Sequence, residues 1–232
     1  MLAFVVSIGA LVVASTAWFQ SRAALAELRG GSRAQADDPS AANRTATIDL
    51  TGVPTLGPPE ARVVLVEFSD YECPYCIRHF NQTMPKITAN YIRTGKIRYA
   101  FRDWPVDQLH PQAIRAHEAA HCAGEQKRYW DMHPRMFGPS GSHTPDRLLA
   151  VAREVGLDMA AYEACVASGR ATPEIRATSD MAQEFGATGT PAFFIGVSNK
   201  GTQNVTLVHA LSGAQDYGVF AKAIDDVLER VK

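Results

Sequence analysis

Residues 63–80 read VVLVEFSDYECPYCIRHF. The run from Val63 to Val66 is apolar and rich in β-branched residues, a pattern typical of a strand that is covered on both faces in a parallel sheet. Two cysteines, Cys73 and Cys76, follow shortly after it. Pro74 between them suits the first turn of a helix, where its missing N–H would have no partner anyway. The stretch therefore predicts a strand, a turn that carries two cysteines, and a helix that begins at that turn.

The sequence that follows extends this start to a βαβ unit. The helical segment is expected to run to about Thr94, with a bend at Pro85, and Gly95 ends it. Residues 97–101 (IRYAF) alternate in polarity like a second strand. Because a helix joins the two strands, we expect them to be parallel, with the cysteines at the strand-to-helix turn.

The rest of the chain divides into a helical block and a second set of strands. Residues 110–184 are alanine-rich and helical in pattern, and strand character returns at residues 192–195 and again at 205–211, which predicts a hairpin. The last helix is marked by one apolar stripe, made up of Phe220, Ala223, Ile224, Val227, Leu228 and Val231. The predicted fold class is α/β, with a βαβ and a ββα half separated by inserted helices.

Composition excludes several broad classes of protein. The chain has 232 residues, a formal net charge of −1, 46% hydrophobic and 9% aromatic residues. A chain of this hydrophobicity can build a packed core, which argues against wholesale disorder, and it is not a multi-span membrane protein. The balanced charge implies no nucleic-acid partner.

The first 60 residues are expected to lie outside the globular part. Residues 2–19 form an apolar run without charge, so residues 1–21 are predicted to be a membrane anchor or a signal peptide, with a buried core helix as the alternative. Residues 22–60 are rich in Gly, Ala, Asp, Pro and Ser and are predicted to be a flexible linker, within which residues 45–50 could form a short strand.

The spacing of Cys73 and Cys76 allows a small disulfide ring to open and close. Backbone N–H groups and the helix dipole favour the thiolate form of a cysteine at a helix N-terminus, so Cys73 is the expected nucleophile. Cys76 lies one turn further into the helix and is expected to resolve the mixed disulfide. Zinc binding uses the same spacing but needs four ligands, and no second pair completes the set, so we expect no metal and no other cofactor.

The segment 63–80, the Gly189-Thr190-Pro191 triplet before a Phe-rich strand, and the helical insert between them resemble the DsbA-like thiol-disulfide oxidoreductases, in particular their BdbD-type branch. The resemblance covers residues 61–232. It implies a thioredoxin fold formed by residues 61–109 and 185–232, with residues 110–184 as an inserted helical domain, and export to an oxidising compartment.

Three further site residues follow from the resemblance. Pro191 matches the cis-proline that faces the cysteines in this family, and Thr190 before it is expected to present its backbone to a bound substrate strand. Glu67 matches the buried acid beneath the active site. Burial would raise the pKa of Glu67, so that it could relay the proton of Cys76; a strand-end carboxylate that faces water is the alternative.

The residues around the cysteines favour a moderately oxidising couple. The active-site loop of Pro74 and Tyr75 has Tyr where strong oxidants of the family often have His. Asp70 and Glu72 add negative charge before Cys73, which is expected to raise its pKa, and Arg78 and His79 are expected to offset part of that effect. We therefore expect a potential less extreme than that of the strongest oxidants.

Cys122 and Cys165 are 43 residues apart in the helical block. In an exported chain we expect a structural disulfide between them, an arrangement that the resemblance also implies, and two buried free thiols are the alternative.

Residues 117–121 spell H-E-x-x-H, the zinc signature of metalloproteases, with Glu118 in the place of the general base. In the longer metzincin version of this signature, the position of the third zinc ligand is occupied by Lys127. The insert is also too small to supply a substrate cleft. We interpret His117 and His121 as surface or helix-packing residues.

Together these features predict an extracytoplasmic or periplasmic oxidase that introduces disulfides into exported proteins through Cys73 and Cys76. Residues 2–19 could anchor it to the inner membrane. Its expected partners are exported proteins with free thiols and a membrane protein of the DsbB or VKOR type that reoxidises it. A disulfide isomerase or reductase of the same compartment is the alternative, and a non-catalytic binding protein or chaperone of the same fold is a weaker one.

Overall fold

The computed structural model describes residues 46–199 and 202–232. The predicted anchor or signal peptide, residues 1–21, and residues 22–45 of the predicted linker lie outside the described residues. In the part of the chain that the structure describes, no helix is both long enough and apolar enough to cross a membrane.

One six-stranded sheet organises the described chain, with β3 (Val63–Ser69) near its centre. All seven residues of β3 are buried, as the uninterrupted apolar run predicts. The strand order is β1-β6-β5-β3-β4-β2, in which β3 and β4 are parallel and the other pairs are antiparallel. The remaining strands are β1 (Thr47–Asp49), β2 (Thr55–Leu56), β4 (Ile97–Asp103), β5 (Ala192–Ser198) and β6 (Asn204–Ser212).

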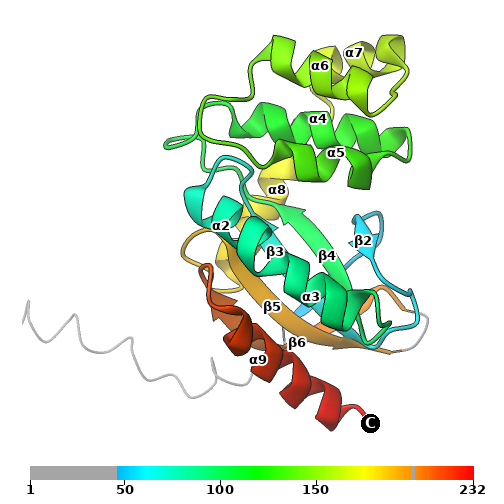
Figure 1. The fold of residues 1–232 in the computed structure, drawn as a ribbon, viewed down its shortest axis with the longest axis vertical. Coiled ribbons are helices and arrows are strands. Elements are labelled where there is room, and N and C mark those ends of the chain that lie inside the picture. Colours follow the sequence, from blue (N-terminus) through cyan, green and yellow to red (C-terminus); the bar gives the residue numbers. More distant parts are fainter. Residues whose placement is uncertain (1–45, 200–201) are drawn as a thin grey trace, which may run out of the picture. The chain divides into compact units, whose positions relative to one another are not determined.

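Helices cover both faces of this sheet. Figure 1 shows α2, α3 and α9 lying across the front face. Their bounds are α2 (Pro74–Gln82), α3 (Met84–Ile87) and α9 (Tyr217–Arg230), and the chain after α3 continues as the wider π-helical turn η2 (Thr88–Ile92). Leu65, Phe193 and Phe220 belong to the core beneath these helices, so the apolar stripe of the last helix is buried as predicted. The predicted fold class, a βαβ unit followed by ββα with inserted helices, is confirmed.

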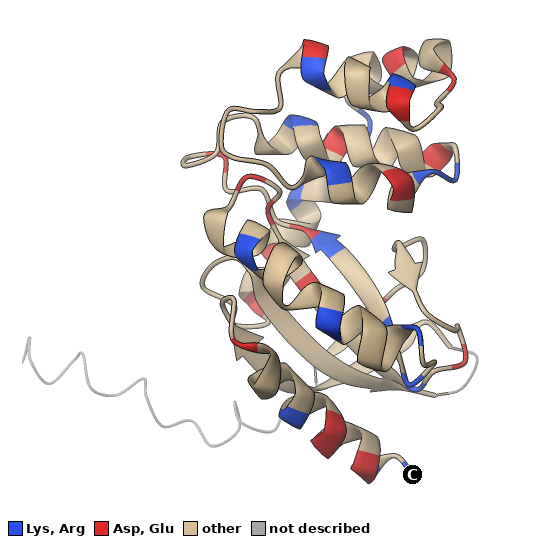
Figure 2. Cartoon of the chain, viewed as in Figure 1, with Lys and Arg blue, Asp and Glu red and all other residues tan. Residues whose placement is uncertain are grey.

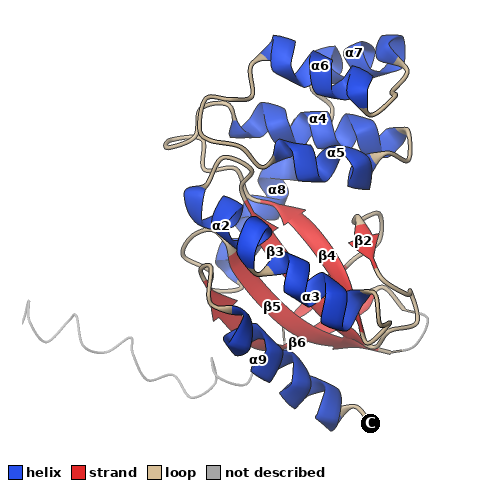
Figure 3. Cartoon of the chain, in the orientation of Figure 1, coloured by secondary structure: helices blue, strands red, loops and turns tan. Residues whose placement is uncertain are grey.

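The inserted helices follow β4, and four of them gather beyond the end of the sheet (Figure 3). They are α4 (Ala113–Glu125), α5 (Tyr129–Met136), α6 (Pro145–Glu154) and α7 (Met159–Ser168). A disulfide between Cys122 of α4 and Cys165 of α7 joins two of these helices. The fifth helix, α8 (Thr172–Glu184), has a second role, because its Ala182 packs with Val66 and Phe68 on the back face of the sheet. The insert therefore supplies part of the sheet's own core.

The described part of the predicted linker, residues 46–60, is attached to the sheet. β1 pairs with β6 and β2 pairs with β4, so this segment contributes both edge strands. Ile48 and Leu50 are buried against the back face. We therefore propose that the sheet-forming domain begins near residue 46 rather than at residue 61.

Charged side chains of both signs occur on the helices. In the view of Figure 2, Lys or Arg and Asp or Glu residues both lie on the inserted helices and on α9, whereas α2 and α3 carry only Lys and Arg. Several of them form exposed ion pairs, such as that between Arg128 and Asp131 and that between Lys222 and Asp226. Exposed pairs of this kind contribute little to stability.

Removal of the Cys122–Cys165 disulfide is expected to destabilise the protein by about 4 kcal/mol, because the bridge restricts a long loop in the unfolded chain. Urea unfolding of the double variant Cys122→Ser/Cys165→Ser measures this loss. The matched control is Cys73→Ser/Cys76→Ser, which removes two thiols and leaves the bridge intact. Alkylation of Cys122 in unfolded but unreduced wild-type protein would show that the bridge does not form.

Candidate active site

Cys73 lies at the start of α2, immediately before Pro74. Its backbone is extended, with φ −70° and ψ 124°, and the helix begins at the next residue, as the sequence predicts. No side chain caps this end of the helix, so the first backbone N–H groups of α2 are directed toward the sulfur of Cys73. Cys73 is 5% exposed, whereas Cys76 is fully buried. Cys73 is therefore the more accessible of the two free thiols.

The environment of Cys73 favours its thiolate. A hydrogen bond from the Cys76 thiol is the largest cause that lowers the pKa of Cys73 to about 6, and the Thr190 side chain and the backbone N–H groups of Cys76 and Tyr75 lower it further. Partial burial acts in the opposite direction. The helix N-terminus contributes as predicted, but the neighbouring thiol contributes more.

Cys76 has the opposite preference. Burial raises its pKa well above the ordinary value, and the adjacent sulfur of Cys73 raises it further, since two thiolates in contact repel each other. The backbone N–H of Asp70 donates a hydrogen bond to Cys76 Sγ at 3.5 Å. At neutral pH the pair therefore holds one thiolate, on Cys73, and one thiol, on Cys76.

The loop before β5 faces the cysteines. The Thr190–Pro191 peptide is cis, and the Thr190 carbonyl oxygen lies 3.6 Å from Cys73 Sγ, from which it accepts a hydrogen bond when Cys73 is a thiol. Cys73 and Thr190, which are 117 positions apart in sequence, thus meet at the active site. Pro191 in turn accepts a hydrogen bond from the N–H of Gly213 at 2.8 Å, which ties the loop to the end of β6.

Glu67 lies beneath the cysteines, inside the sheet. It is 1% exposed, and burial raises the pKa of its carboxyl group to about 7. The Tyr99 hydroxyl donates to Glu67 Oε2 at 2.7 Å and partly opposes that shift. Glu67 is thus a buried acid that changes protonation near neutral pH, and the alternative of a water-facing carboxylate is wrong.

His79 on α2 is the other titratable group beside Glu67. Its Nε2 lies 3.8 Å from Glu67 Oε2, and neither ring nitrogen has a hydrogen-bond partner. Burial lowers the pKa of His79 to about 3, so its ring is neutral and packs against Phe193 and Phe220. The prediction that His79 offsets acidic charge near Cys73 is therefore wrong, because the side chain points into the core.

Asp70 and Glu72 do not act as free charges beside Cys73. Both are fully buried, and neither is among the causes that set the pKa of Cys73. Asp70 Oδ1 accepts the N–H of Glu72 at 2.7 Å, and Asp70 Oδ2 lies 2.7 Å from His110 Nδ1. Glu72 Oε1 lies 3.0 Å from His143 Nδ1 and accepts a backbone N–H as well. The expectation that these carboxylates raise the pKa of Cys73 is wrong, since histidines and backbone groups of the insert engage them.

Tyr75 and Arg78 form the exposed side of the active-site turn. Tyr75 is 59% exposed, and the Arg78 guanidinium lies over its ring at 5.3 Å from the centroid. Arg78 also donates to the carbonyl oxygen of Ala214 at 2.9 Å, across from α2. The guanidinium thus packs against the exposed ring of Tyr75.

The H-E-x-x-H residues hold a carboxylate. His117 Nδ1 lies 2.5 Å from Asp103 Oδ1, and His121 Nε2 lies 2.8 Å from Asp103 Oδ2. Glu118 accepts the hydroxyl of Thr172. Within the described residues, no group of three or more His, Cys, Asp or Glu side chains is arranged to bind a metal ion. His117 is buried, so a surface position is wrong for it, whereas His121 is partly buried.

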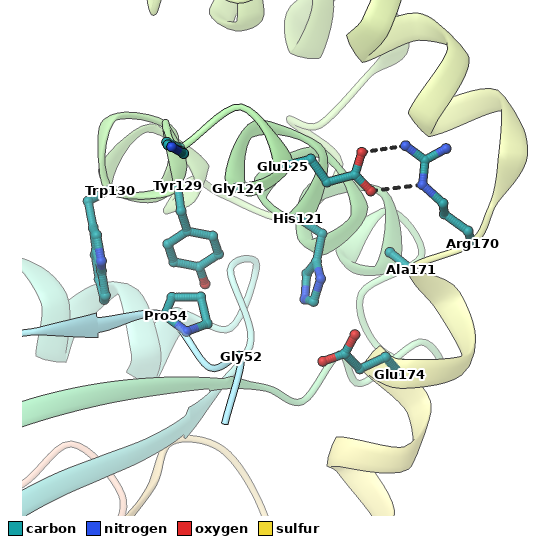
Figure 4. A pocket seen from close by; sticks show the side chains of 11 residues that line it. Gly52, Pro54, His121, Gly124, Glu125, Tyr129, Trp130, Arg170, Ala171 and Glu174 are labelled. Atoms are coloured by element: carbon teal, nitrogen blue, oxygen red, sulfur yellow. Dashed lines mark hydrogen bonds and ion pairs between the residues drawn. The ribbon is translucent and has the colours of Figure 1, made fainter. Parts of the chain in front are cut away.

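Figure 4 shows the cavity that His121 borders, with Glu174 on one side and Tyr129 and Trp130 on the other. Its volume is about 580 Å³, and the bidentate pair of Glu125 and Arg170 lies at its edge. None of the residues that line this cavity is one of the two free cysteines. The redox site lies elsewhere, at the start of α2.

Sequence reasoning missed the residues that attach the active-site turn to the insert. His110 and His143 reach it through Asp70 and Glu72, and the Tyr71 hydroxyl is hydrogen-bonded to His133 Nδ1 at 2.8 Å. The sequence indicated these contacts only through the concentration of histidines, most of which lie in the insert. Which carboxylate each histidine meets could not be read from their spacing.

Comparison with known protein families supports the same fold. A family model described as thioredoxin matches residues 50–225. Among solved structures, alpha-DsbA1 of Wolbachia pipientis has a TM-score of 0.66 at 23% identity, covering 79% of this chain and 94% of that one. Oxidised BdbD of Bacillus subtilis has a TM-score of 0.66 at 21% identity, covering 80% and 97%. A thioredoxin-like oxidoreductase of Silicibacter pomeroyi has a TM-score of 0.62 at 29% identity, covering 76% and 92%.

Curated relatives of this chain are named as antiporters, and the chain matches only part of their length. A protein of Salinispora arenicola named Na(+)/H(+) antiporter NhaA 1 is 33% identical over 171 residues, which is 73% of this chain and 26% of the relative. One of Herminiimonas arsenicoxydans with the name Na(+)/H(+) antiporter NhaA is 29% identical and is covered to 25%. This chain thus spans about a quarter of the length of these curated relatives.

Glu67 is expected to make the stability of the dithiol protein fall as pH rises. Between its ordinary pKa of 4.5 and the folded value of about 7, the unfolded chain releases the proton and the folded chain keeps it. The loss amounts to about 3 kcal/mol above pH 7 and is absent below pH 4.5. Glu67→Gln cannot ionise, so its stability relative to wild type should increase by about that amount from pH 4 to pH 8, measured by urea unfolding. A difference that does not change with pH would contradict the raised pKa.

Proposed function

This chain belongs to the thioredoxin family, and from that premise we propose that it is an extracytoplasmic thiol-disulfide oxidoreductase of the DsbA-like branch that introduces disulfides into exported proteins. The observation that carries the proposal is the opposite acidity of two adjacent thiols. Cys73 is accessible and has a lowered pKa, whereas Cys76 is buried and has a raised one. A nucleophile and a resolving thiol need this difference.

The exchange proceeds in two balanced steps. In the oxidised protein a substrate thiolate attacks Cys73 Sγ, so that a bond forms between the substrate and Cys73 and the Cys73–Cys76 bond breaks. Cys76 leaves as a thiolate and takes up a proton. A second substrate thiolate then attacks the substrate sulfur of the mixed disulfide, and Cys73 leaves as a thiolate. The substrate gains one disulfide, and the protein is left as a dithiol.

The active-site geometry supports Cys73 as the leaving group in the second step. A thiol with a pKa of about 6 leaves readily near neutral pH, because its thiolate is the stable form. The Thr190 backbone lies beside Cys73 Sγ, and Pro191 has no N–H to compete for a partner. An extended substrate segment can therefore pair with Thr190 while its sulfur reacts.

The acidity of Cys73 supports transfer of the disulfide from this protein to its substrate. A pKa of about 6 lies between the thioredoxin value of about 7 and the DsbA value of about 3.5. A more stable thiolate favours the reduced protein and hence oxidation of the substrate. This supports a moderately oxidising couple. Reoxidation then requires a membrane protein of the DsbB or VKOR type, as in the family the chain resembles.

The proposed compartment is extracytoplasmic, with residues 2–19 as anchor or signal. The Cys122–Cys165 disulfide supports it, since structural disulfides persist in oxidising compartments. The relatives named Na(+)/H(+) antiporters also support a location at a membrane, because a region similar to this chain forms a quarter of proteins so named. Antiport itself is not proposed, since the similarity is confined to that quarter.

The proposed function is tested in a strain that lacks its periplasmic oxidase. Wild-type protein should restore disulfide formation in exported proteins, and acid-quenched alkylation should find Cys73 and Cys76 mostly oxidised. Cys76→Ala should accumulate mixed disulfides with exported proteins, because the resolving thiol is missing, while Cys73→Ala should form none. Non-reducing electrophoresis detects the trapped species.

Three results would contradict the proposal in different ways. Equal trapping by Cys76→Ala and Cys73→Ala would overturn the roles of the two cysteines. A wild-type protein that is mostly reduced in the cell and fails to restore disulfides would indicate an isomerase or reductase instead. A phenotype that survives the loss of both cysteines would indicate a binding protein or chaperone.

A further inference from the structure

Two buried oxygen atoms beneath Cys76 have no hydrogen-bond partner. One is Glu67 Oε1 and the other is Ser69 Oγ, and both residues are almost completely inaccessible to solvent. Glu67 Oε2, in contrast, is occupied by the Tyr99 hydroxyl at 2.7 Å. A buried hydroxyl group without a partner costs free energy, so its presence calls for an explanation other than stability.

Ser69 is placed between Glu67 and Cys76 by the register of β3. Alternate residues of a strand point to the same face, so Glu67 and Ser69 both face α2, the helix that carries Cys76. Asp70, which directly follows Ser69, donates its backbone N–H to Cys76 Sγ at 3.5 Å. The end of β3 therefore lies against the sulfur of Cys76, and the Ser69 side chain projects from that end.

The electrostatics agree with this placement. The Ser69 hydroxyl lowers the pKa of Glu67 and also lowers that of Cys76, which a hydroxyl does when it lies near both groups and can turn its proton toward either. One hydroxyl is thus within reach of both the thiol and the acid. A hydroxyl group can accept one hydrogen bond while it donates another, which is what transfer of a proton requires.

We propose that the hydroxyl group of Ser69 relays the proton between the Cys76 sulfur and the Glu67 carboxyl group during thiol-disulfide exchange. The inference rests on the proposed function, and it adds a residue to the reaction. When Cys76 leaves as a thiolate, Ser69 gives its hydroxyl proton to the sulfur and takes the proton of the Glu67 carboxyl group. The products are the Cys76 thiol, the intact Ser69 hydroxyl and the Glu67 carboxylate, so charge and protons balance.

When Cys76 is the attacking group, the same path runs in reverse. The Cys76 proton passes to Ser69 and the Ser69 proton passes to the Glu67 carboxylate, which frees a thiolate to attack Cys73. Tyr99 holds the other carboxylate oxygen throughout. Tyr99 also lines a cavity of about 590 Å³ next to α3 and α5.

The other groups around Glu67 leave its proton free to move. His79 of α2 lies 3.8 Å away and is neutral, because burial lowers its pKa to about 3. Tyr99 of β4 and Tyr129 of α5 have pKa values raised well above the ordinary value, so both are uncharged at neutral pH. With no cation beside it, the carboxyl group titrates near pH 7 and can serve as acid or base.

The relay is tested on the full-length reduced protein, with oxidised glutathione as the probe. Cys73 first forms a mixed disulfide with glutathione, and Cys76 then resolves it. Acid quenching and mass spectrometry follow both steps. In Ser69→Ala the first step should change less than about twofold, while resolution at pH 7 should slow by about tenfold or more, since positioned proton transfer contributes at least that much.

The pH profile and two further variants separate a relay from a structural role. Wild-type resolution should level off above pH 7, where Glu67 is ionised, whereas Ser69→Ala should keep accelerating with hydroxide concentration. Ser69→Thr keeps the hydroxyl and should restore the wild-type profile. The double variant Ser69→Ala/Glu67→Gln should resolve the mixed disulfide no more slowly than the slower of the two single variants. Each substitution interrupts the same proton path, so the second one has nothing further to remove. Ser198→Ala removes another buried serine, at the end of β5, and should leave both steps unchanged.

Each outcome decides between the two proposals. If wild-type protein forms no mixed disulfide with glutathione, the proposed function fails. If wild-type protein reacts and Ser69→Ala resolves the mixed disulfide at the wild-type rate and pH profile, the relay alone is overturned. Should Ser69→Ala fail to fold, resolution by wild-type protein in mixtures of light and heavy water decides, since two protons in flight give a curved dependence and one gives a straight line.

Discussion

The contact between the end of β3 and the first turn of α2 is the constraint on which the reactive centre depends. β3 is buried along its whole length, and its last residues bring the Asp70 N–H to Cys76 Sγ. This contact buries Cys76 and leaves Cys73 at the helix start, so two identical side chains three residues apart have opposite acidities. Burial of Cys76 and the hydrogen bond between the two thiols are the largest causes of this difference, and Thr190 and the first backbone N–H groups of α2 add to it.

The inserted helices contribute to this arrangement although none of their side chains reaches the sulfurs. His110 and His143 bind the carboxylates of Asp70 and Glu72, which flank the turn, and Tyr71 is held by His133. Buried carboxylates without such partners would carry a large desolvation cost. The insert therefore fixes the active-site turn, while α8 closes the back of the sheet through Ala182. Substitutions far from Cys73 can for this reason act on it through the backbone of the turn.

Much of the fold could be predicted from the sequence because it is encoded in local patterns. The run Val63 to Val66 identifies a buried strand, Pro74 the start of a helix and the stripe from Phe220 the last helix, and all three are as expected. The charges near Cys73 could not be predicted, since Asp70 and Glu72 meet histidines about 40 and 71 residues away. His117 and His121 spelled a metal motif, yet the carboxylate of Asp103 from another element occupies them. Local pattern predicts elements, whereas partners over long separations depend on the packing.

The acidity of Cys73 is the property that all of this produces, and its most direct test is the rate of alkylation of the reduced protein by iodoacetamide as a function of pH, with the labelled cysteine identified by mass spectrometry. We expect Cys73 alone to react at neutral pH, with a midpoint near 6. In Cys76→Ala the midpoint should rise, because the hydrogen bond that lowers the pKa most is lost. A midpoint for Cys73 near the ordinary thiol value of about 8.5, or labelling of Cys76 at a similar rate, would contradict the stabilised thiolate.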